Sequence, residues 1–374
     1  MLATAVIVSY NRQDVLRRQL LYYANKPIHL IFADGSDDDW GSGDSGSIGE
    51  MTWEYFRISG YNSVLKRLVE AVHRVETEFM FFIDDEECIL WTGVEQAVGF
   101  LRQNPDHSCA GGRVEIANSV NRRMWVDRWG HWSRPFSLLD EDSIARMSKM
   151  IKTNRTANLF YQIHRTLIVK EFYKRLPDFD VSRLYLGKVE IMLTGLVVAQ
   201  GKWIRGDYPF WFRYGNSVAV PSTVPNFMSE SDATEMMKWF EYALTDAFGG
   251  VNSVSTENLK IKDFEELLLG SYGKFASLPK RIRNKRKIDR NFKWLVSVIQ
   301  RQSKYSIKKL TLTFFPEAFE KKYPDEAMRV KTYAARYSGG SQEVVADLAK
   351  FEDIWSRFPN GLSNSKYEQE LARV

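Results

Sequence analysis

The sequence predicts an α/β fold, a mostly parallel sheet flanked by helices, followed by an all-helical C-terminal unit. Short β-rich runs alternate with helix-period runs over the first third of the chain. From Ser229 onward the spacing of apolar residues is helical throughout. The 374 residues are about twice a usual single-domain length, so two units are expected. We place them at 1–222 and 223–374, with the boundary near the prolines of 221–225.

The first unit is expected to alternate strands and helices. Strands are predicted where β-branched and aromatic residues cluster, and helices where apolar residues recur three or four apart, with Asp14 and Thr92 near two N-termini. Residues 37–49 are rich in Asp, Gly and Ser and predict a loop, and 118–158 is expected to be irregular. The expected strands are 3–9, 28–33, 53–57, 79–83, 110–116, 167–169 and 203–206, and the expected helices are 14–24, 62–75, 92–103, 171–176 and 188–200.

Composition excludes several classes of protein. Hydrophobic residues at 44% and charged residues at 26% are typical of a globular chain and exclude disorder. The 52 Lys and Arg exceed the 47 Asp and Glu by only 5, which is too mild a bias to indicate a nucleic-acid partner. Two cysteines, Cys88 and Cys109, cannot build a disulfide framework and fit a reducing compartment, so the cytoplasm is expected. The start of the chain is interpreted as a buried strand, and no apolar run reaches the roughly 18 to 20 residues that span a bilayer.

Four adjacent carboxylates follow the apolar run 79–83 directly. Because like charges repel at such spacing, they indicate a cation among them, and oxygen ligands favour Mg²⁺ or Mn²⁺. Residues two apart point the same way as they leave a strand, so Asp84 with Glu86 is the preferred pair and Asp85 with Glu87 the other. A solvated acidic turn is the alternative interpretation.

Polar residues also follow the first two expected strands, where open α/β folds bind ligands. The first strand runs into Ser9, Tyr10 and Arg12, and the second ends at Asp34, which could accept a hydrogen bond from a base or ribose. A turn-forming Asp-Gly pair is an equal alternative for Asp34. Neither turn contains a G-x-G-x-x-G or Walker sequence, so dinucleotide and P-loop sites lack their fingerprints.

Four segments in this order resemble family 2-type glycosyltransferases with the Rossmann-like GT-A fold. They are VIVSYNR (6–12), ADGS (33–36), the helix start GYN (60–62) and the acidic segment TEFMFFIDDE (77–86). Together they cover about the first 115 residues, and 165–206 resembles the acceptor-side half more weakly. The resemblance implies a nucleotide-sugar donor, UDP-linked in the commonest case, a divalent metal and a glycan or lipid-linked acceptor. It suggests a role in bacterial surface polysaccharide synthesis.

The resemblance also implies roles for individual residues. The acidic pair Asp84 and Glu86 would hold the metal, although Glu86 replaces the usual final Asp and its acidic neighbours leave the assignment ambiguous by one position. The expected nucleotide-sugar contacts are Ser9, Tyr10, Arg12, Asp34, Asn62, Asp84, Asp85 and Arg213. Arg213 is included because a guanidinium fits phosphate oxygens, with an ordinary surface arginine as the alternative.

An inverting transfer needs a carboxylate that takes the acceptor's proton. Glu190 is the favoured base because it lies in the first turn of the helix 188–200, off the apolar stripe. Asp180 and Asp178 are the other candidates for the base. A carboxylate that only stabilises the helix N-terminus is an equal interpretation of Glu190.

Secondary acceptor contacts are expected from His164, Trp129 and Trp132, since aromatic rings stack on sugars. A structural histidine and tryptophans in the core, Trp125 included, are the alternatives. The segment 280–290 carries seven basic residues in eleven and predicts a helix that lies on an anionic membrane, or else a solvated basic face.

Two other functions compete with the transferase. A sugar nucleotidyltransferase of the same fold also needs acidic metal ligands, but it usually has a glycine-rich basic loop near its start, which residues 9–14 lack. A non-catalytic membrane-surface binding protein would instead use the basic segment 280–290. Loss of metal-linked nucleotide binding on replacing the acidic pair would separate an enzyme from a scaffold.

Overall fold

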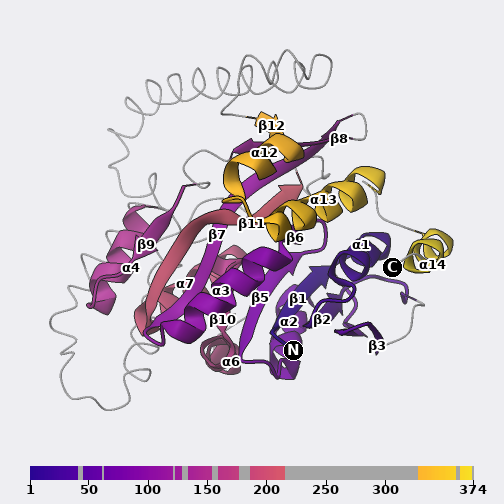
Figure 1. Ribbon diagram of the computed structural model, residues 1–374. Coiled ribbons are helices and arrows are strands. Elements are labelled where there is room, and N and C mark those ends of the chain that lie inside the picture. The colour runs from indigo at the N-terminus through magenta and orange to yellow at the C-terminus, as the bar shows by residue number, and fades with distance from the viewer. Residues whose placement is uncertain are drawn as a thin grey trace, which may run out of the picture.

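The predicted α/β architecture is confirmed in the computed structural model. Its described part contains one sheet with helices on both faces (Figure 1). The expected unit boundary near 222 and the basic segment 280–290 lie outside the described residues. The described residues are 1–40, 45–60, 63–120, 123–128, 134–153, 159–176, 186–214, 327–358 and 363–372.

Four parallel strands form the N-terminal half of the sheet. In spatial order they are β4 (Met51–Arg57), β2 (Ile28–Asp34), β1 (Ala3–Ser9) and β5 (Phe79–Asp84). The side chains of β1, β2 and β5 are almost all buried, as strands covered on both faces require, whereas in β4 only alternate residues are buried. The register aligns the last residue of β1 with the last of β2, and its penultimate residue with the last of β5. The carboxyl ends of these three strands therefore meet at one edge.

The rest of the sheet is mixed, so the expectation of a mostly parallel sheet holds only in part. β10 (Ile163–Arg165) runs antiparallel between β5 and β7 (His107–Val120). β7 then pairs in parallel with β11 (Lys202–Tyr214), which is much longer than the expected strand there. The strand expected at 167–169 is wrong. That apolar run opens α6 (Thr166–Arg175), in which helical spacing buries Val169, Phe172 and Tyr173 on one face.

Two segments expected to lack regular structure contain strands. β3 (Ser45–Ile48) pairs antiparallel with β4, because an edge strand needs only backbone groups to add to a sheet. The region 118–158 contains β8 (Arg123–Arg128) and β9 (Phe136–Leu138). β8 continues β7 as a hairpin, and β9 pairs with β11. A two-residue strand, β6 (Cys88–Ile89), also pairs with β11.

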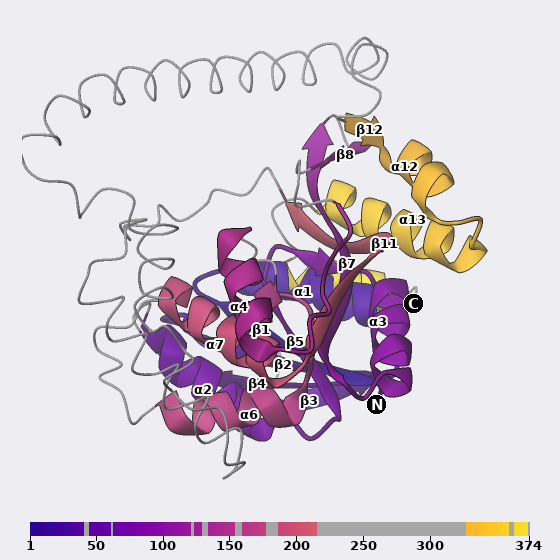
Figure 2. The same ribbon diagram turned by 90° about the vertical axis from the view of Figure 1, so that its left-hand side faces the viewer.

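Helices cover the two faces separately (Figure 2). α2 (Val64–Arg74), α6, α7 (Leu186–Gln200) and α4 (Ser143–Lys152) contact one another in turn on one face. α1 (Gln13–Tyr23) and α3 (Trp91–Gln103) lie on the other. Neither expected N-cap is confirmed: Arg12 and Leu90 occupy those positions, and neither caps with its side chain.

The described C-terminal segment belongs to the same body. β12 (Ala327–Arg329) pairs with β8, so the expectation of helices alone is wrong there, because the edge of β8 offers backbone partners. α12 (Val330–Tyr337), α13 (Gln342–Arg357) and α14 (Asn364–Leu371) follow, and α13 contacts α1 and α3. The two ends of the described chain thus share one core.

The cysteines and the helices of the structure bear on two expectations from composition. Cys88 and Cys109 are both buried and free, as expected for a chain without a disulfide framework. Within the described ranges, no helix combines the length and the apolar character needed to cross a membrane.

A buried carboxylate joins α13 to the first half of the chain. Asp347 accepts hydrogen bonds from the Tyr22 hydroxyl at 2.8 Å and from the Thr92 N–H and hydroxyl at 2.9 and 3.0 Å. Asp347→Ala leaves these buried donors unpaired, so we expect a loss of about 2–4 kcal/mol in the free energy of unfolding. Urea unfolding measures it. Asp353→Ala, on an exposed part of the same helix, should cost about 0.5 kcal/mol or less, and equal effects would contradict the assignment.

Candidate functional site

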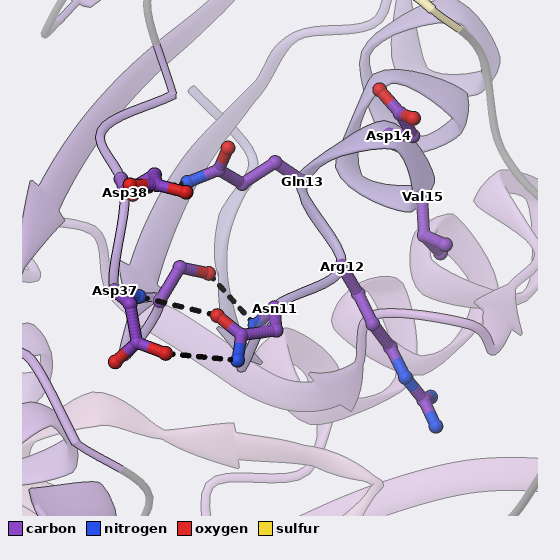
Figure 3. Close-up of a pocket in the computed structure, with 8 residues that line it drawn as sticks. Asn11, Arg12, Gln13, Asp14, Val15, Asp37 and Asp38 are labelled. Atoms are coloured by element: carbon purple, nitrogen blue, oxygen red, sulfur yellow. Dashed lines mark hydrogen bonds between the residues drawn. The ribbon is translucent and has the colours of Figure 1, made fainter.

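A cavity of about 480 Å³ lies at the carboxyl ends of β1 and β2. The first turn of α1 forms one wall and the loop after β2 forms the other (Figure 3). Its position is the one at which open α/β sheets bind ligands. The lining is polar and consists of Asn11, Arg12, Gln13, Asp14, Val15, Ser36, Asp37 and Asp38.

Asn11 ties the two walls together. Its backbone has a φ of 54°, a left-handed conformation that asparagine tolerates better than most residues. Its N–H donates to the Ser36 hydroxyl at 2.8 Å, and its side-chain oxygen accepts from the Asp37 N–H at 3.1 Å. Figure 3 shows Asn11 directed at Asp37, whereas Arg12 points away from both aspartates of the loop. Hydrogen bonds between the loop after β1 and the loop after β2 therefore hold the two walls of the cavity together.

Asp34 lies beneath this cavity with no exposed surface. Its carboxylate accepts from the Ser36 N–H and hydroxyl at 3.1 and 2.7 Å, from Gln13 Nε2 at 3.1 Å and from the Tyr55 hydroxyl at 2.9 Å. Burial, together with this carboxylate, raises the pKa of Tyr55. In this structure Asp34 orders two residues of the lining. Its expected direct contact with a nucleotide stays a prediction.

The carboxyl end of β5 continues into the acidic turn, residues 84–87. The turn is closed by a hydrogen bond of 3.1 Å from its last N–H to its first carbonyl. The carbonyls of its second and fourth residues accept from Gln19 Nε2 at 3.1 and 2.6 Å. The carbonyl of its third residue accepts from Trp355 Nε1 at 3.0 Å. Every carbonyl of the turn thus has a donor.

Arg12 joins the cavity to the acidic turn. Its guanidinium lies 2.6 Å from the Glu86 carboxylate and 3.4 Å from that of Asp85. The Ser9 hydroxyl donates to the other Asp85 oxygen at 2.9 Å. Burial raises the pKa of Asp85 to about 7, and Arg12 opposes that rise. Ser9 and Arg12, both expected nucleotide contacts, therefore hold the acidic turn in this state.

The remaining inward carboxylate of the turn is Glu87. Trp211 Nε1 donates to it at 2.6 Å and Arg213 Nε at 2.7 Å. Burial raises its pKa, and Asp84 adds to the rise. Asp85 and Glu87 are thus buried and engaged, whereas Asp84 and Glu86 retain partial exposure. The two expected pairs therefore differ in exposure, as the alternation of side chains two residues apart predicts.

Tyr161 connects the acidic turn to Glu190. Its hydroxyl lies 3.4 and 3.5 Å from the two Asp84 oxygens and 3.5 Å from a Glu190 oxygen, and its ring stacks on Trp211 at 4.4 Å. Burial raises the pKa of Glu190 to about 8, with Asp84 contributing. The expected place of Glu190 in the first turn of its helix is wrong, because α7 begins at Leu186 and its first turn contains no acidic residue. The fold nevertheless brings Glu190 to the acidic turn through Tyr161.

The other expected site residues have different fates. His164 lies inside the sheet on β10 with no exposed surface, so its expected acceptor contact is wrong. Its Nε2 lies 2.9 Å from the Phe160 carbonyl, and burial lowers its pKa to about 4. Tyr10 is half-buried in the loop after β1. Trp125 is buried, as the core alternative expects. Asn62, Trp129, Trp132, Asp178 and Asp180 lie outside the described residues.

Sequence reasoning missed three side chains that build this site: Gln19, Tyr161 and Trp355. Gln19 had a usable signal, since it is a polar residue within the apolar stripe of α1, between Leu16 and Leu20. A polar residue on a buried face needs a partner, and the acidic turn supplies it. The other two offered no local signal, because their partners are distant in sequence.

The turn offers two carboxylates that fit a hard divalent cation, fewer than a complete set of protein ligands. Asp84 and Glu86 are partly exposed oxygen donors, which Mg²⁺ and Mn²⁺ prefer. Elsewhere in the described chain, as here, no group of three or more His, Cys, Asp or Glu is arranged to hold a metal. Two carboxylates suit a cation that takes its other ligands from phosphates and water.

Comparisons with known proteins give structural similarity only. No protein-family model matches the chain, and no curated protein matches it. A crystal structure of S. aureus TarS 1–349 is 12% identical, with a TM-score of 0.47, and the match covers 96% of this chain and 92% of that one. The UDP-GlcNAc complex of TarS 1–349 is 13% identical, with the same coverage and a TM-score of 0.45. At these identities and TM-scores, the similarity establishes neither a family nor a function for this chain.

The pKa of Glu190 predicts how stability changes with pH. The folded protein holds this proton up to about pH 8, whereas an ordinary glutamate has a pKa of 4.5. Between these values the folded state binds more protons, so the carboxyl's contribution to stability is lost as pH rises. Glu190→Gln should match wild type near pH 5 and melt at least about 2 °C higher near pH 9. Melting curves in EDTA test this, and a constant offset at all pH values would contradict it.

Proposed function

We propose that this protein is a glycosyltransferase of the GT-A type that uses a nucleotide-sugar donor. The observation that supports this most is the sharing of Arg12 between the polar cavity and the acidic turn. A nucleoside site and a diphosphate site must be adjacent in such an enzyme, and here one side chain spans both. The resemblance of the first 115 residues to family 2-type glycosyltransferases agrees with this arrangement.

The cavity suits the nucleoside half of the donor. Its loop wall carries Asp37 and Asp38, which can accept hydrogen bonds from ribose hydroxyls or base N–H groups and would repel a phosphate. The diphosphate is then expected on the other side, near Arg12 and Arg213. Both guanidinium groups face carboxylates of the acidic turn, and the planar fork of a guanidinium matches the geometry of phosphate oxygens. The acidic loop on one side and the arginines on the other would thereby fix the orientation in which the donor binds.

Asp84 and Glu86 are the proposed ligands for Mg²⁺ or Mn²⁺. Such a cation, when bound, would neutralise charge on the departing diphosphate. Arg12 compensates Glu86 in this structure, so donor binding is expected to redistribute that contact. Asp85 and Glu87 are not part of this proposal, because both carboxylates are buried and accept hydrogen bonds from Ser9, Trp211 and Arg213. The metal ambiguity left by the sequence is resolved in this proposal toward the first pair.

Glu190 is the proposed base of an inverting transfer. It would take the acceptor hydroxyl's proton at one carboxylate oxygen, while Tyr161 orients the carboxylate. Its raised pKa makes the ionised carboxylate a stronger base than an exposed glutamate, and this ionised form prevails above about pH 8. Asp180 remains the alternative base in this proposal. The acceptor is a hydroxyl of a glycan or of a lipid-linked glycan, which would suit surface polysaccharide synthesis and contact between segment 280–290 and an anionic membrane.

Donor binding is tested first, by thermal shift with UDP, UDP-GlcNAc, GDP, CDP and dTDP, each with and without Mn²⁺. Because a ligand stabilises the state that binds it, one nucleotide should raise the melting temperature in a metal-dependent way. Asp84→Ala should abolish the metal-dependent part, and Asp353→Ala, a matched change on an exposed carboxylate, should not. No shift with any nucleotide would contradict the transferase. It would favour a membrane-binding role for segment 280–290.

Glu190→Gln separates catalysis from binding. We expect it to retain the nucleotide-induced thermal shift and to lower turnover by about 10²–10⁴-fold, the usual contribution of a general base. Donor-sugar transfer or hydrolysis measured as released nucleotide diphosphate gives the rate. Retention of more than about a tenth of the activity would reject Glu190 as the base. Formation of a nucleotide sugar from sugar phosphate and nucleoside triphosphate would instead support the nucleotidyltransferase.

A further inference from the structure

Helix α13 reaches the acidic turn from the far end of the chain. Trp355 has no exposed surface, and its indole N–H donates to the Glu86 carbonyl at 3.0 Å. Its ring packs edge-on against Tyr22 at 5.8 Å and lies 5.1 Å from Phe351. Figure 1 shows α13 alongside α1 and close to β6, just beyond the turn. The contact links residues 269 positions apart.

The same helix holds a buried cation below the turn. Arg18, on α1, is 1% exposed, and its guanidinium lies 5.1 Å from the Trp355 ring and 5.8 Å from the Tyr214 ring. Its Nη1 also donates to the Phe358 carbonyl at 3.2 Å, just past the end of α13. Burial lowers its pKa to about 10, against the attraction of nearby charges that include Asp85 and Glu86. The charge of Arg18 on α1 and the hydrogen bond of Trp355 on α13 therefore both act on the turn.

We propose that Trp355 is a positioning residue of the donor site. It fixes the backbone at Glu86, so that this carboxylate stays where Arg12 and a bound cation can reach it. The inference rests on the proposed function and adds to it a role for the C-terminal helix. α13 is then part of the donor site.

The reason lies in the repulsion within the turn. Four neighbouring carboxylates favour an opened, more solvated backbone. Arg12 and Arg213 compensate part of that charge, and hydrogen bonds to the carbonyls hold the backbone itself closed. Gln19 holds two of these carbonyls, and Trp355 alone among the described residues is shown to hold the third. Loss of the indole N–H leaves a carbonyl of the turn without this donor and lets Glu86 move. α13 itself stays anchored, because Asp347 and Phe351 pack elsewhere.

Trp355→Phe in the full chain tests this, because it keeps an aromatic ring and removes the donor. Trp203→Phe is the matched control: Trp203 is also fully buried, and its Nε1 has no hydrogen-bond partner within the described structure. The measurement is the affinity for the nucleotide diphosphate that stabilises wild type, with and without Mn²⁺. We expect Trp355→Phe to lower the metal-dependent gain in affinity by about five- to tenfold. Trp203→Phe should leave that gain unchanged.

The outcomes separate the two proposals. Wild type that binds no nucleotide with Mn²⁺ overturns the proposed function itself. Wild type that binds, with Trp355→Phe indistinguishable from Trp203→Phe, overturns only the positioning role. An equal loss of affinity with and without Mn²⁺ also overturns it, because a general structural defect acts on both. If Trp355→Phe does not fold, Trp355→Leu gives the same test, since it also removes the indole N–H, and an unchanged metal-dependent gain in that variant rejects the inference.

Discussion

Mutual repulsion among the four carboxylates of the acidic turn is the constraint around which this edge of the protein is organised. The backbone of the turn is held by Gln19 and Trp355 through its carbonyls. Its charges are compensated by Arg12 on the cavity side and Arg213 on the β11 side. The protein therefore supplies countercharge to the turn from its own side chains. A turn held in this way avoids the ordering cost that a flexible acidic loop would add to binding.

This arrangement assigns different tasks to chemically similar groups. Asp85 and Glu87 have a structural role, since each is buried and accepts hydrogen bonds, Asp85 from Ser9 and Glu87 from Trp211 and Arg213. Asp84 and Glu86 keep exposure and remain available for chemistry. The Tyr161 hydroxyl contacts both Asp84 and Glu190. This one side chain therefore links the proposed metal ligand to the proposed base. A substitution at any of these positions is expected to change the pKa values of the others, because they interact in a poorly solvated environment.

The sequence was informative where the signal is local. The strands that end in Ser9, Asp34 and Asp84 were predicted because a buried parallel strand is a short apolar run, and the pairing of alternate carboxylates follows from strand geometry. Prediction failed where partners decide the outcome. β3 is a strand only because β4 lies beside it, and Leu167 opens a helix although its neighbours are β-branched. The contacts of Trp355 could not be predicted, since no residue near it in the sequence indicates that it will contact the acidic turn, 269 positions away.

The pairing of β12 with β8 and the seat of α13 on α1 have a consequence for biosynthesis. Each contact joins segments that lie far apart in the sequence, β12 to β8 and α13 to α1, so the chain loops that must close are long. Loops of that size slow folding, because chain entropy is lost before the contacts that repay it are made. An emerging nascent chain can form β1, β2 and β5 early, yet it lacks Asp347 and Trp355 until translation has reached α13, far downstream of β5. Support of the acidic turn by α13 is thus delayed until that helix has been synthesised, and earlier ribosome-bound intermediates would present an unsupported acidic loop.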